Sequence, residues 1–419
     1  MSEWRFLHAA DIHLDSPLLG LDRYEGVPVE AIRGATRRAF DRLIELAIEE
    51  RVAFVLIAGD LYDGDWRDYG TGLYFGRCMA RLREAGIRVF IVAGNHDAQS
   101  RITRQLRLPG NVTLFSTRHP ETEIVEEFDV ALHGQGFARP KVSEDLSAAY
   151  PEREPALFNI GLLHTSLDGR PGHDPYAPCS VDGLRAKGYD YWALGHVHQR
   201  EIVSEEPWIV YPGNLQGRHV RESGAKGCTL VTVDDGELVS QEHRALDVLR
   251  WTRLEIDIQG LADLDELLDT LHARFAEASD SADGRVLALR LRLAGRGALH
   301  AELHRHREHL EQECRQLAID QPGPGIWLEK LELATRAPRD GLAAAAGDEA
   351  LEDLLRELLS DDQNVPMEPP AELRALRDKL PPELREAGCD PTDEGFLREA
   401  AIAARDLLVT RLLDGEDEG

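Results

Sequence analysis

The feature that most constrains this chain is an arrangement repeated along its first 200 residues, in which an apolar run ends at a cluster of polar side chains. The clearest case is Ile87–Val92, which is followed by Ala-Gly-Asn-His-Asp. A short apolar run of this kind predicts a buried strand, and the glycine lets the chain turn sharply after it. Asn95, His96 and Asp97 then supply an amide, an imidazole that titrates near neutrality and a carboxylate.

Four further predicted strands end in the same way. They span residues 4–10, 54–58, 157–163 and 189–194, and the side chains that follow them are Asp11 and His13, Asp60, His164, and His196 and His198. Helical patterns separate the first three strands, and a β-α-β-α-β order predicts neighbouring parallel strands. In such sheets the loops at the carboxyl ends of the strands form the site. We therefore expect these polar side chains to converge.

The collected side chains have the composition of a metal site. With His96 set aside, two carboxylates, four imidazoles and one amide remain, which is more than one tetrahedral zinc ion can bind. The set suits two ions that share one carboxylate. Because it combines nitrogen and oxygen donors without a thiolate, it fits Mn²⁺, Fe²⁺ or Zn²⁺ and does not choose among them.

The rest of the chain predicts additional structure beyond this first domain, which we assign to residues 1–247. Residues 248–336 have the alternating strands and amphipathic helices of a small α+β domain. Amphipathic helices are expected at 342–359 and 396–413, with a proline-rich break between them. We interpret residues 337–419 as a helical region that either completes the core or docks a partner.

The composition limits where the protein is expected to be located and what it is expected to bind. The chain has 419 residues, 42% of them hydrophobic, and no apolar run near the ~20 residues that span a bilayer, so we expect no membrane partner. Its first residues lack a signal-peptide pattern, and five scattered cysteines predict a reducing, cytoplasmic location. The net charge is −28, of which residues 251–419 carry −18. Metal ions or a partner would have to attract a polyanionic substrate.

The motifs D-x-H, GD, GNHD, H and GHxH occur in this order, and the set resembles the calcineurin-like metallophosphoesterase superfamily over about residues 4–245. The sequences of residues 8–17, 58–63 and 211–219 resemble those of the SbcD-like DNA repair exonucleases, especially their YhaO-type branch. The resemblance implies an α/β fold, a four-layer α-β-β-α sandwich of mixed sheets, with a small α+β capping domain and C-terminal helices.

The resemblance also implies a role for each matched residue. One metal ion is assigned to Asp11, His13 and His198. The other is assigned to Asn95, His164 and His196, and Asp60 bridges the two. His96 then faces the substrate as a catalytic residue and Asp97 supports it. Mn²⁺ is the metal that the resemblance favours.

The function that the resemblance implies is a metal-dependent DNA nuclease of DNA repair. It would hydrolyse phosphodiester bonds by a two-metal mechanism with a bridging hydroxide, as an exonuclease or alternatively an endonuclease. An SbcC-like coiled-coil ATPase and a homodimer are the implied partners. A phosphodiesterase or phosphatase acting on small molecules or phosphoproteins is an alternative, because the same site serves all of these. A DNA-end-binding scaffold without activity is disfavoured, since no metal-ligating residue of the motifs is missing from the sequence.

Two polar residues near these motifs have less definite roles. Some family members carry a second histidine three residues after the bridging aspartate, and here that position is Asp63. Help to the transition state from that side is therefore not expected, and Asp63 would support the ligands instead. His219 follows Gly-Arg in a loop, where contact with substrate and a bland surface role are equally consistent with the sequence.

Other histidines are interpreted as structural. His8 and His133 lie within apolar runs, so we expect them to be hydrogen-bonded core residues. A helix predicted at 298–317 carries four more, and its glutamate and arginine neighbours favour a solvated helix face over a metal site. These four are His300, His304, His306 and His309.

Overall fold

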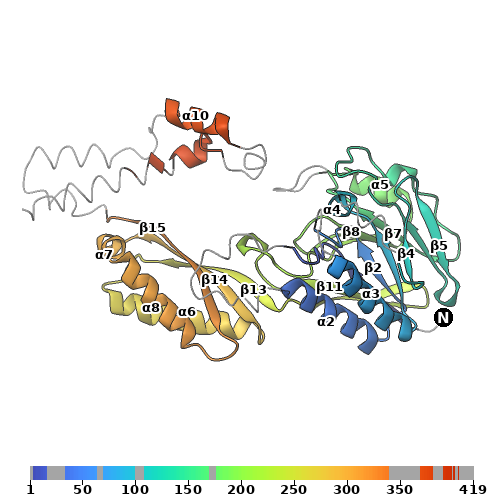
Figure 1. Ribbon diagram of the computed structural model, residues 1–419, viewed down its shortest axis with the longest axis horizontal. Coiled ribbons are helices and arrows are strands. Elements are labelled where there is room, and N and C mark those ends of the chain that lie inside the picture. Colours follow the sequence, from blue (N-terminus) through green and yellow to red (C-terminus); the bar gives the residue numbers. More distant parts are fainter. Residues whose placement is uncertain are drawn as a thin grey trace, which may run out of the picture. The chain divides into compact units, whose positions relative to one another are not determined.

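A computed structural model describes most of the chain, in two compact units. The described residues are 3–16, 34–63, 69–99, 108–168, 176–338, 369–380, 390–398, 400–401 and 404. The first unit comprises Met1–Arg253, Ala276–Arg290 and Ala318–Glu329. The second comprises Leu254–Phe275, Leu291–Leu317 and Lys330–Gly419. Figure 1 shows the helices and strands of both units.

The first sheet of the first unit has the strand order β12-β11-β1-β2-β3-β4. Its strands are β1 (Trp4–Ala9), β2 (Phe54–Ala58), β3 (Arg88–Val92), β4 (Val112–Leu114), β11 (Gly227–Asp234) and β12 (Glu237–Ala245). The strands β1 to β4 are parallel neighbours, whereas β11 runs antiparallel to β1 and β12. The predicted parallel β-α-β-α-β segment is therefore present in a mixed sheet.

The second sheet has the order β5-β6-β7-β8-β10-β9. Its strands are β5 (Glu121–Val125), β6 (Val130–Gly134), β7 (Phe158–His164), β8 (Tyr191–Gly195), β9 (Glu201–Glu205) and β10 (Trp208–Tyr211). The central four are parallel, and the edge strands β5 and β9 are antiparallel to their neighbours. The sheet is thus also mixed.

Side chains on alternate faces of the central strands make two cores. In β2, Val55 and Ile57 pack in the cluster that also contains Phe40 of helix α2 (Ala35–Glu49). Phe54 and Leu56 point the other way, into a cluster with residues of β7 and β8. Because both faces are covered, these strands are continuously apolar.

Helices cover the outer faces of both sheets (Figure 1). Helices α2 and α3 (Tyr69–Glu84) pack on the first sheet, and Leu184 of α5 (Val181–Ala186) packs with Trp192 of the second. The order of layers is helix, sheet, sheet, helix, as the resemblance implies, so the mixed α/β sandwich is confirmed.

A third sheet has the order β13-β14-β15, with strands Leu249–Asp257, Val286–Arg296 and Ile326–Arg336. Helix α6 (Leu264–Ser281) lies between β13 and β14 in the chain. The predicted single helix at 298–317 is instead two helices, α7 (His300–Arg305) and α8 (Arg307–Ile319). The break falls at His306, which has a non-helical backbone conformation.

His300 is not on a solvated face, so that prediction is wrong for this residue. Its side chain is buried, and Nδ1 shares a hydrogen bond of 3.0 Å with Oγ1 of Thr335 on β15. A short helix that begins at His300 turns this side chain toward the strand, where a hydroxyl provides a partner. His304, His306 and His309 are exposed, as expected.

Several predicted elements lie partly or wholly outside the described residues. They are the start, at 28–33, of the helix expected between the first two strands over about residues 28–50, the helix at 342–359 and most of the helix at 396–413. A helix that the sequence did not predict, α10 (Ala371–Lys379), begins directly after Pro370. Within the described part of the chain, no helix is long and apolar enough to cross a membrane.

Candidate metal centre

The polar residues predicted from the strand ends lie at the carboxyl ends of five parallel strands. Asp11 and His13 follow β1, Asp60 follows β2, and Asn95, His96 and Asp97 open the short helix α4 (Asn95–Gln99) after β3. His164 is the last residue of β7, and His196 and His198 follow β8. Because the two sheets pack face to face, these ends are brought together between them.

The loops after β1 and β2 hold each other in an unusual backbone conformation. The amide of Asp11 donates to the carbonyl of Gly59, and the amide of His13 donates to that of Asp60, both at 3.0 Å. Asp11, His13 and Asp60 have φ values of 49°, 47° and 52°, which are uncommon for residues other than glycine. Such strain persists where the surroundings impose it, and it clusters at functional sites.

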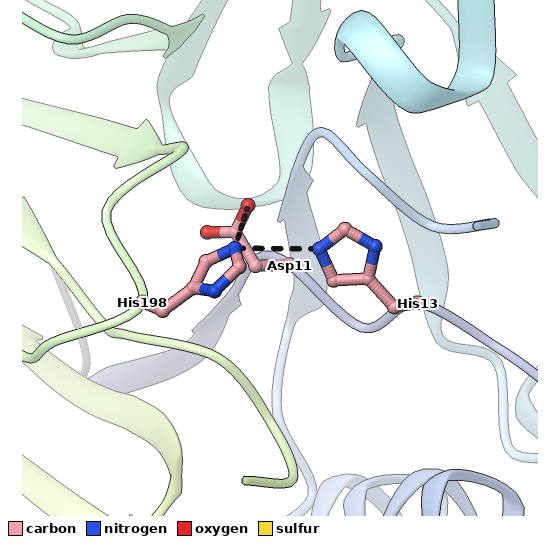
Figure 2. A group of neighbouring side chains, drawn as sticks. All are labelled: Asp11, His13 and His198. Atoms are coloured by element: carbon pink, nitrogen blue, oxygen red, sulfur yellow. Dashed lines mark hydrogen bonds and ion pairs between the residues drawn. The ribbon is translucent and has the colours of Figure 1, made fainter. Parts of the chain in front are cut away.

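Asp11, His13 and His198 form one group of ligand-type atoms (Figure 2). The Nε2 atoms of the two histidines are 3.4 Å apart, and Nε2 of His198 is 3.8 Å from Oδ1 of Asp11. Figure 2 shows the two rings pointing toward each other, with the carboxylate beside them. Asp11 and His13 are fully buried, and the ligand-type atoms of the three residues lie within 4.8 Å of one another.

Asn95, His164 and Asp60 form a second group. Nε2 of His164 is 2.9 Å from Oδ1 of Asn95 and 3.5 Å from Oδ2 of Asp60. The same Oδ2 atom is 3.9 Å from Nε2 of His13, so Asp60 is within reach of both groups. The other ring nitrogen of His164 lies 3.0 Å from the carbonyl oxygen of Ala58, which fixes the orientation of the ring.

His196 contributes to both groups in different ways. Its backbone amide donates to the carboxylate of Asp11, at 3.0 Å and 3.2 Å from the two oxygens. Its ring packs edge-on against the ring of His164, with centroids 5.2 Å apart. The backbone at His196 has a φ of 102°, another conformation that non-glycine residues rarely adopt.

Asp97 joins the loops after β2 and β3. Its carboxylate accepts hydrogen bonds from the backbone amides of Leu61, Tyr62 and Gly94, at 3.2, 2.9 and 3.0 Å. Burial, together with the nearby charge of Asp60, raises the pKa of Asp97 to about 6. Asp97 thus acts on the backbone around the site.

The ring of His96 contacts Asp63. Nδ1 of His96 is 3.2 Å from Oδ1 of Asp63, and the amide of His96 donates to Oδ1 of Asp60 at 2.9 Å. Asp63 also lies 3.4 Å from Nδ1 of His13 and accepts from the hydroxyl of Ser16 at 2.7 Å. Asp63 therefore links two imidazoles of the site.

Two glycines are required by close approaches within the site. Gly59 has a φ of 95°, and a Cβ there would lie 2.3 Å from Nδ1 of His164. A Cβ at Gly94 would lie 2.2 Å from Oδ1 of Asp60. Neither distance leaves room for a methyl group, so replacing either glycine by any other residue would push His164 or Asp60 out of place.

The electrostatics of the centre fit bound cations. Burial and the charge of Asp60 raise the pKa of Asp11 well above its usual value, and burial raises that of Asp60 as well. Burial lowers the pKa of His13 and brings that of His164 to about 4. Neutral imidazoles next to two buried carboxylates are the donor set that divalent cations bind, and the cations would relieve the repulsion between the carboxylates.

The sequence interpretation missed one acid, Glu222. This buried carboxylate lies 2.7 Å from Nδ1 of His198, and it accepts from Nδ2 of Asn214 at 2.9 Å and from the amide of Arg218 at 2.7 Å. A carboxylate behind an imidazole commonly orients metal-binding histidines. The nearest sequence signal was the segment 211–219, which resembles the family but ends three residues before Glu222. His219 is exposed, and its Nε2 lies 3.6 Å from Glu222.

Comparison with known proteins agrees with this geometry. The calcineurin-like phosphoesterase family matches residues 5–200, and the family described as the middle domain of the metallophosphoesterase YhaO matches residues 251–336. The uncharacterized metallophosphoesterase YhaO of Bacillus subtilis is 36% identical over 299 residues, which cover 70% of this chain and 72% of that protein.

Two archaeal proteins are more distantly similar. The DNA double-strand break repair protein Mre11 of Sulfurisphaera tokodaii is 26% identical over 291 residues, covering 62% of this chain and 67% of its own. The protein of the same name from Methanopyrus kandleri is 28% identical over 282 residues, covering 59% and 58%. The chain therefore belongs to the calcineurin-like metallophosphoesterases, hydrolases that use divalent metal ions, and within them to the YhaO-type branch.

Proposed function

We propose that this protein is a metal-dependent nuclease of DNA repair that hydrolyses phosphodiester bonds in DNA. The observation that carries the proposal is the position of Asp60, whose Oδ2 atom is within 3.9 Å of His13 and 3.5 Å of His164, so that one carboxylate serves two groups of ligand-type atoms. The Mre11 proteins that resemble the chain are named for DNA double-strand break repair, which supports DNA as the substrate.

The proposed ligands divide as the two groups do. Asp11, His13 and His198 would hold one ion, and Asn95, His164 and His196 the other. Asp60 would bridge them. When bound, two divalent cations would neutralise a phosphodiester and lower the pKa of the attacking water. Mn²⁺ is the metal we propose, and Fe²⁺ and Zn²⁺ suit the same nitrogen and oxygen donors.

His96 would donate a proton to the departing oxygen. Burial acts to lower the pKa of His96, but the hydrogen bond with Asp63 and the charges of Asp60 and Asp63 outweigh it, so the pKa is raised. With Nδ1 directed at Asp63, the protonated ring carries its second proton on Nε2. A general acid needs a proton to give at the working pH, and the raised pKa supplies it.

The parts after the first domain would govern access and assembly. We propose that residues 1–247 form the nuclease domain and that 248–336 act as a cap that limits which DNA shapes reach the metals. Residues 337–419 would dock an SbcC-like coiled-coil ATPase, and the nuclease would work as a homodimer. A chain ending near residue 339 should then hydrolyse a small phosphodiester at a near-normal rate and lose co-purification with the ATPase.

The charge of the chain favours a second candidate, a phosphodiesterase or phosphatase for small molecules or phosphoproteins. The net charge is −28, and the sequence has no run of basic residues that would bind a polyanion through counterion release. A small phosphoester needs no such block, because the metal ions themselves would bind it.

A substrate panel separates the candidates. The protein loaded with Mn²⁺, Fe²⁺ or Zn²⁺ is offered linear duplex DNA, bis-p-nitrophenyl phosphate, cyclic nucleotides and phosphopeptides, with Asp60→Ala as the inactive control. The nuclease proposal expects cleavage of DNA and of the small diester, both lost in the variant. Turnover of cyclic nucleotides or phosphopeptides with intact DNA would favour the second candidate. DNA binding without hydrolysis of any substrate would indicate a scaffold.

A further inference from the structure

Arg218 lies against the candidate metal centre, between two carboxylates. Its Nη1 is 3.8 Å from Oδ1 of Asp63, and its Nη2 is 3.3 Å from Oε1 of Glu222. Nη2 is also 3.3 Å from Nδ1 of His198, a proposed metal ligand. The side chain is 17% exposed, so the guanidinium is at the edge of the buried cluster and within reach of a molecule that enters it.

Glu222 fixes the segment that carries Arg218. The carboxylate binds the backbone amide of Arg218 through one oxygen, which also accepts from Asn214, and it meets the ring of His198 through the other. Contact with His198, Glu222 and Asp63 lowers the rotational freedom of the long side chain. A guanidinium held in this way loses less entropy when it binds an anion.

Asp63 places Arg218 and His96 on the same side of the centre. One oxygen, Oδ1, is 3.2 Å from Nδ1 of His96 and 3.8 Å from Nη1 of Arg218. Because His96 and Arg218 contact the same carboxylate oxygen, their side chains lie close to each other. Asp63 thus contacts both an imidazole and a guanidinium.

The guanidinium has hydrogen-bonding capacity to spare. An arginine has five N–H donors, and the distance of 3.8 Å from Nη1 to Asp63 exceeds a hydrogen bond. Among the described residues, Nη1 therefore makes an ion pair without a close acceptor, and Nη2 makes the closer contacts. A phosphoryl oxygen is an acceptor that arginine binds strongly, often through two N–H groups.

From these contacts we propose that Arg218 is a catalytic residue that binds a non-bridging oxygen of the scissile phosphate, with Glu222 and Asp63 as its positioning residues. The inference rests on the proposed phosphodiester hydrolysis and names the group that stabilises its transition state. The attacking water would first release one proton to solvent. As the resulting hydroxide oxygen bonds to phosphorus and the bond to the departing oxygen breaks, Arg218 holds the charge on the phosphoryl oxygen. It transfers no proton, and the departing oxygen takes its proton from His96.

The test compares Arg218→Gln and Arg218→Lys with Arg221→Gln, a matched control at an exposed arginine three residues away. For each Mn²⁺-loaded protein, elemental analysis gives the metal content, and calorimetry gives the dissociation constant of inorganic phosphate. The rate of bis-p-nitrophenyl phosphate hydrolysis gives kcat and KM. Arg218→Gln should keep its metals, lower kcat by ~10²–10³-fold and weaken phosphate binding about tenfold. Arg218→Lys should recover part of both, and Arg221→Gln should match the parent.

Two results would overturn the inference. One is Arg218→Gln with the kcat and phosphate affinity of the parent. The other is loss of metal from both Arg218 variants, which would make the residue a support for His198 and not a ligand for phosphate. If the parent protein hydrolyses no phosphodiester, the proposed function fails instead, and the phosphate titration still decides whether Arg218 binds the anion.

Discussion

Nδ1 of His198 lies 2.7 Å from Oε1 of Glu222, although 24 residues separate the two in the chain. The other ring nitrogen of His198 faces His13 and Asp11. The acid therefore stands behind the ring on the side opposite to the candidate metal. Contact with His198 and the charge of Arg218 outweigh burial, so the pKa of Glu222 is lowered far below its usual value and the carboxylate is ionised.

Replacing Glu222 should weaken metal binding without abolishing it. In Glu222→Gln the amide can still bond His198, but it lacks the charge that favours the ring orientation and raises its basicity. Loss of such a partner typically costs 10–100-fold in metal affinity. Titration of the apoprotein with Mn²⁺, followed by calorimetry, measures the change. An affinity equal to that of the parent would show that Glu222 only holds the loop.

Asp60→Ala should remove both metal ions, because Oδ2 of Asp60 is within reach of His13 in one group and His164 in the other. His198→Ala should weaken mainly one ion, since its Nε2 atom faces His13 and Asp11 of the first group. Elemental analysis after gel filtration gives the number of ions that each variant retains. Two tightly held ions in Asp60→Ala would exclude a bridging role for this carboxylate.

The ligand cluster was predictable from the sequence because of a property of parallel sheets. Each strand of this class ends at the same edge, so polar residues directly after apolar runs must meet there. That rule anticipates that Asp11 and Asp60 lie together at one edge of the first sheet, and His164 of the second sheet joins them because the two sheets pack face to face. A second rule, that a polar group inside an apolar strand needs a hydrogen-bond partner, anticipates the buried, hydrogen-bonded His8 and His133.

The supporting residues were not predictable in this way. Arg218 lies in an irregular segment after β10, and Glu222 ends a 3-10 helix of three residues, Val220–Glu222. No periodicity in so short a stretch shows which way its side chains turn. His300 was misjudged because a continuous helix was assumed, whereas the break at His306 leaves a short helix that faces β15. The left-handed backbone at Asp11 and His13 also leaves no mark in the sequence, because the neighbouring loop imposes it.

His96→Asn should keep the metals and lose turnover. The ring meets Asp63 and lies in one group with His13 and Asp60, whose ligand-type atoms are within 4.8 Å of one another. The backbone amide that donates to Asp60 is retained in the variant. Loss of a general acid costs ~10²–10⁴-fold in rate. The loss should be smaller on bis-p-nitrophenyl phosphate than on DNA, because nitrophenolate departs without a proton. Equal losses on both substrates, or loss of metal, would refute the role of His96 as an acid.

The last prediction concerns stability, and it rests on His8 in the central strand β1. The ring is fully buried, with Nδ1 at 2.9 Å from the hydroxyl of Tyr191 and Nε2 at 3.1 Å from the carbonyl oxygen of Leu194. Burial lowers the pKa of His8 to about 3, although the hydrogen bond to Leu194 opposes this. Unfolding restores the ordinary value of ~6.5. Between these two values the unfolded chain binds a proton that the folded chain does not.

This difference contributes stability that is present above pH ~6.5 and lost as the pH falls toward 3, with a slope of about 1.4 kcal/mol per pH unit. His8→Gln removes the titrating group, so the slope of unfolding free energy against pH should fall by up to that amount between pH 4 and 6. Urea unfolding in the presence of a chelator measures it, because metal release then makes no contribution. Asp11, Asp60 and Asp97, whose pKa values are raised, give slopes of the opposite sign, whereas Glu222, whose pKa is lowered, gives one of the same sign. These contributions cancel between parent and variant. His119→Gln, at an exposed position, controls for the loss of a histidine. An unchanged slope in His8→Gln would mean that His8 is protonated in the folded protein.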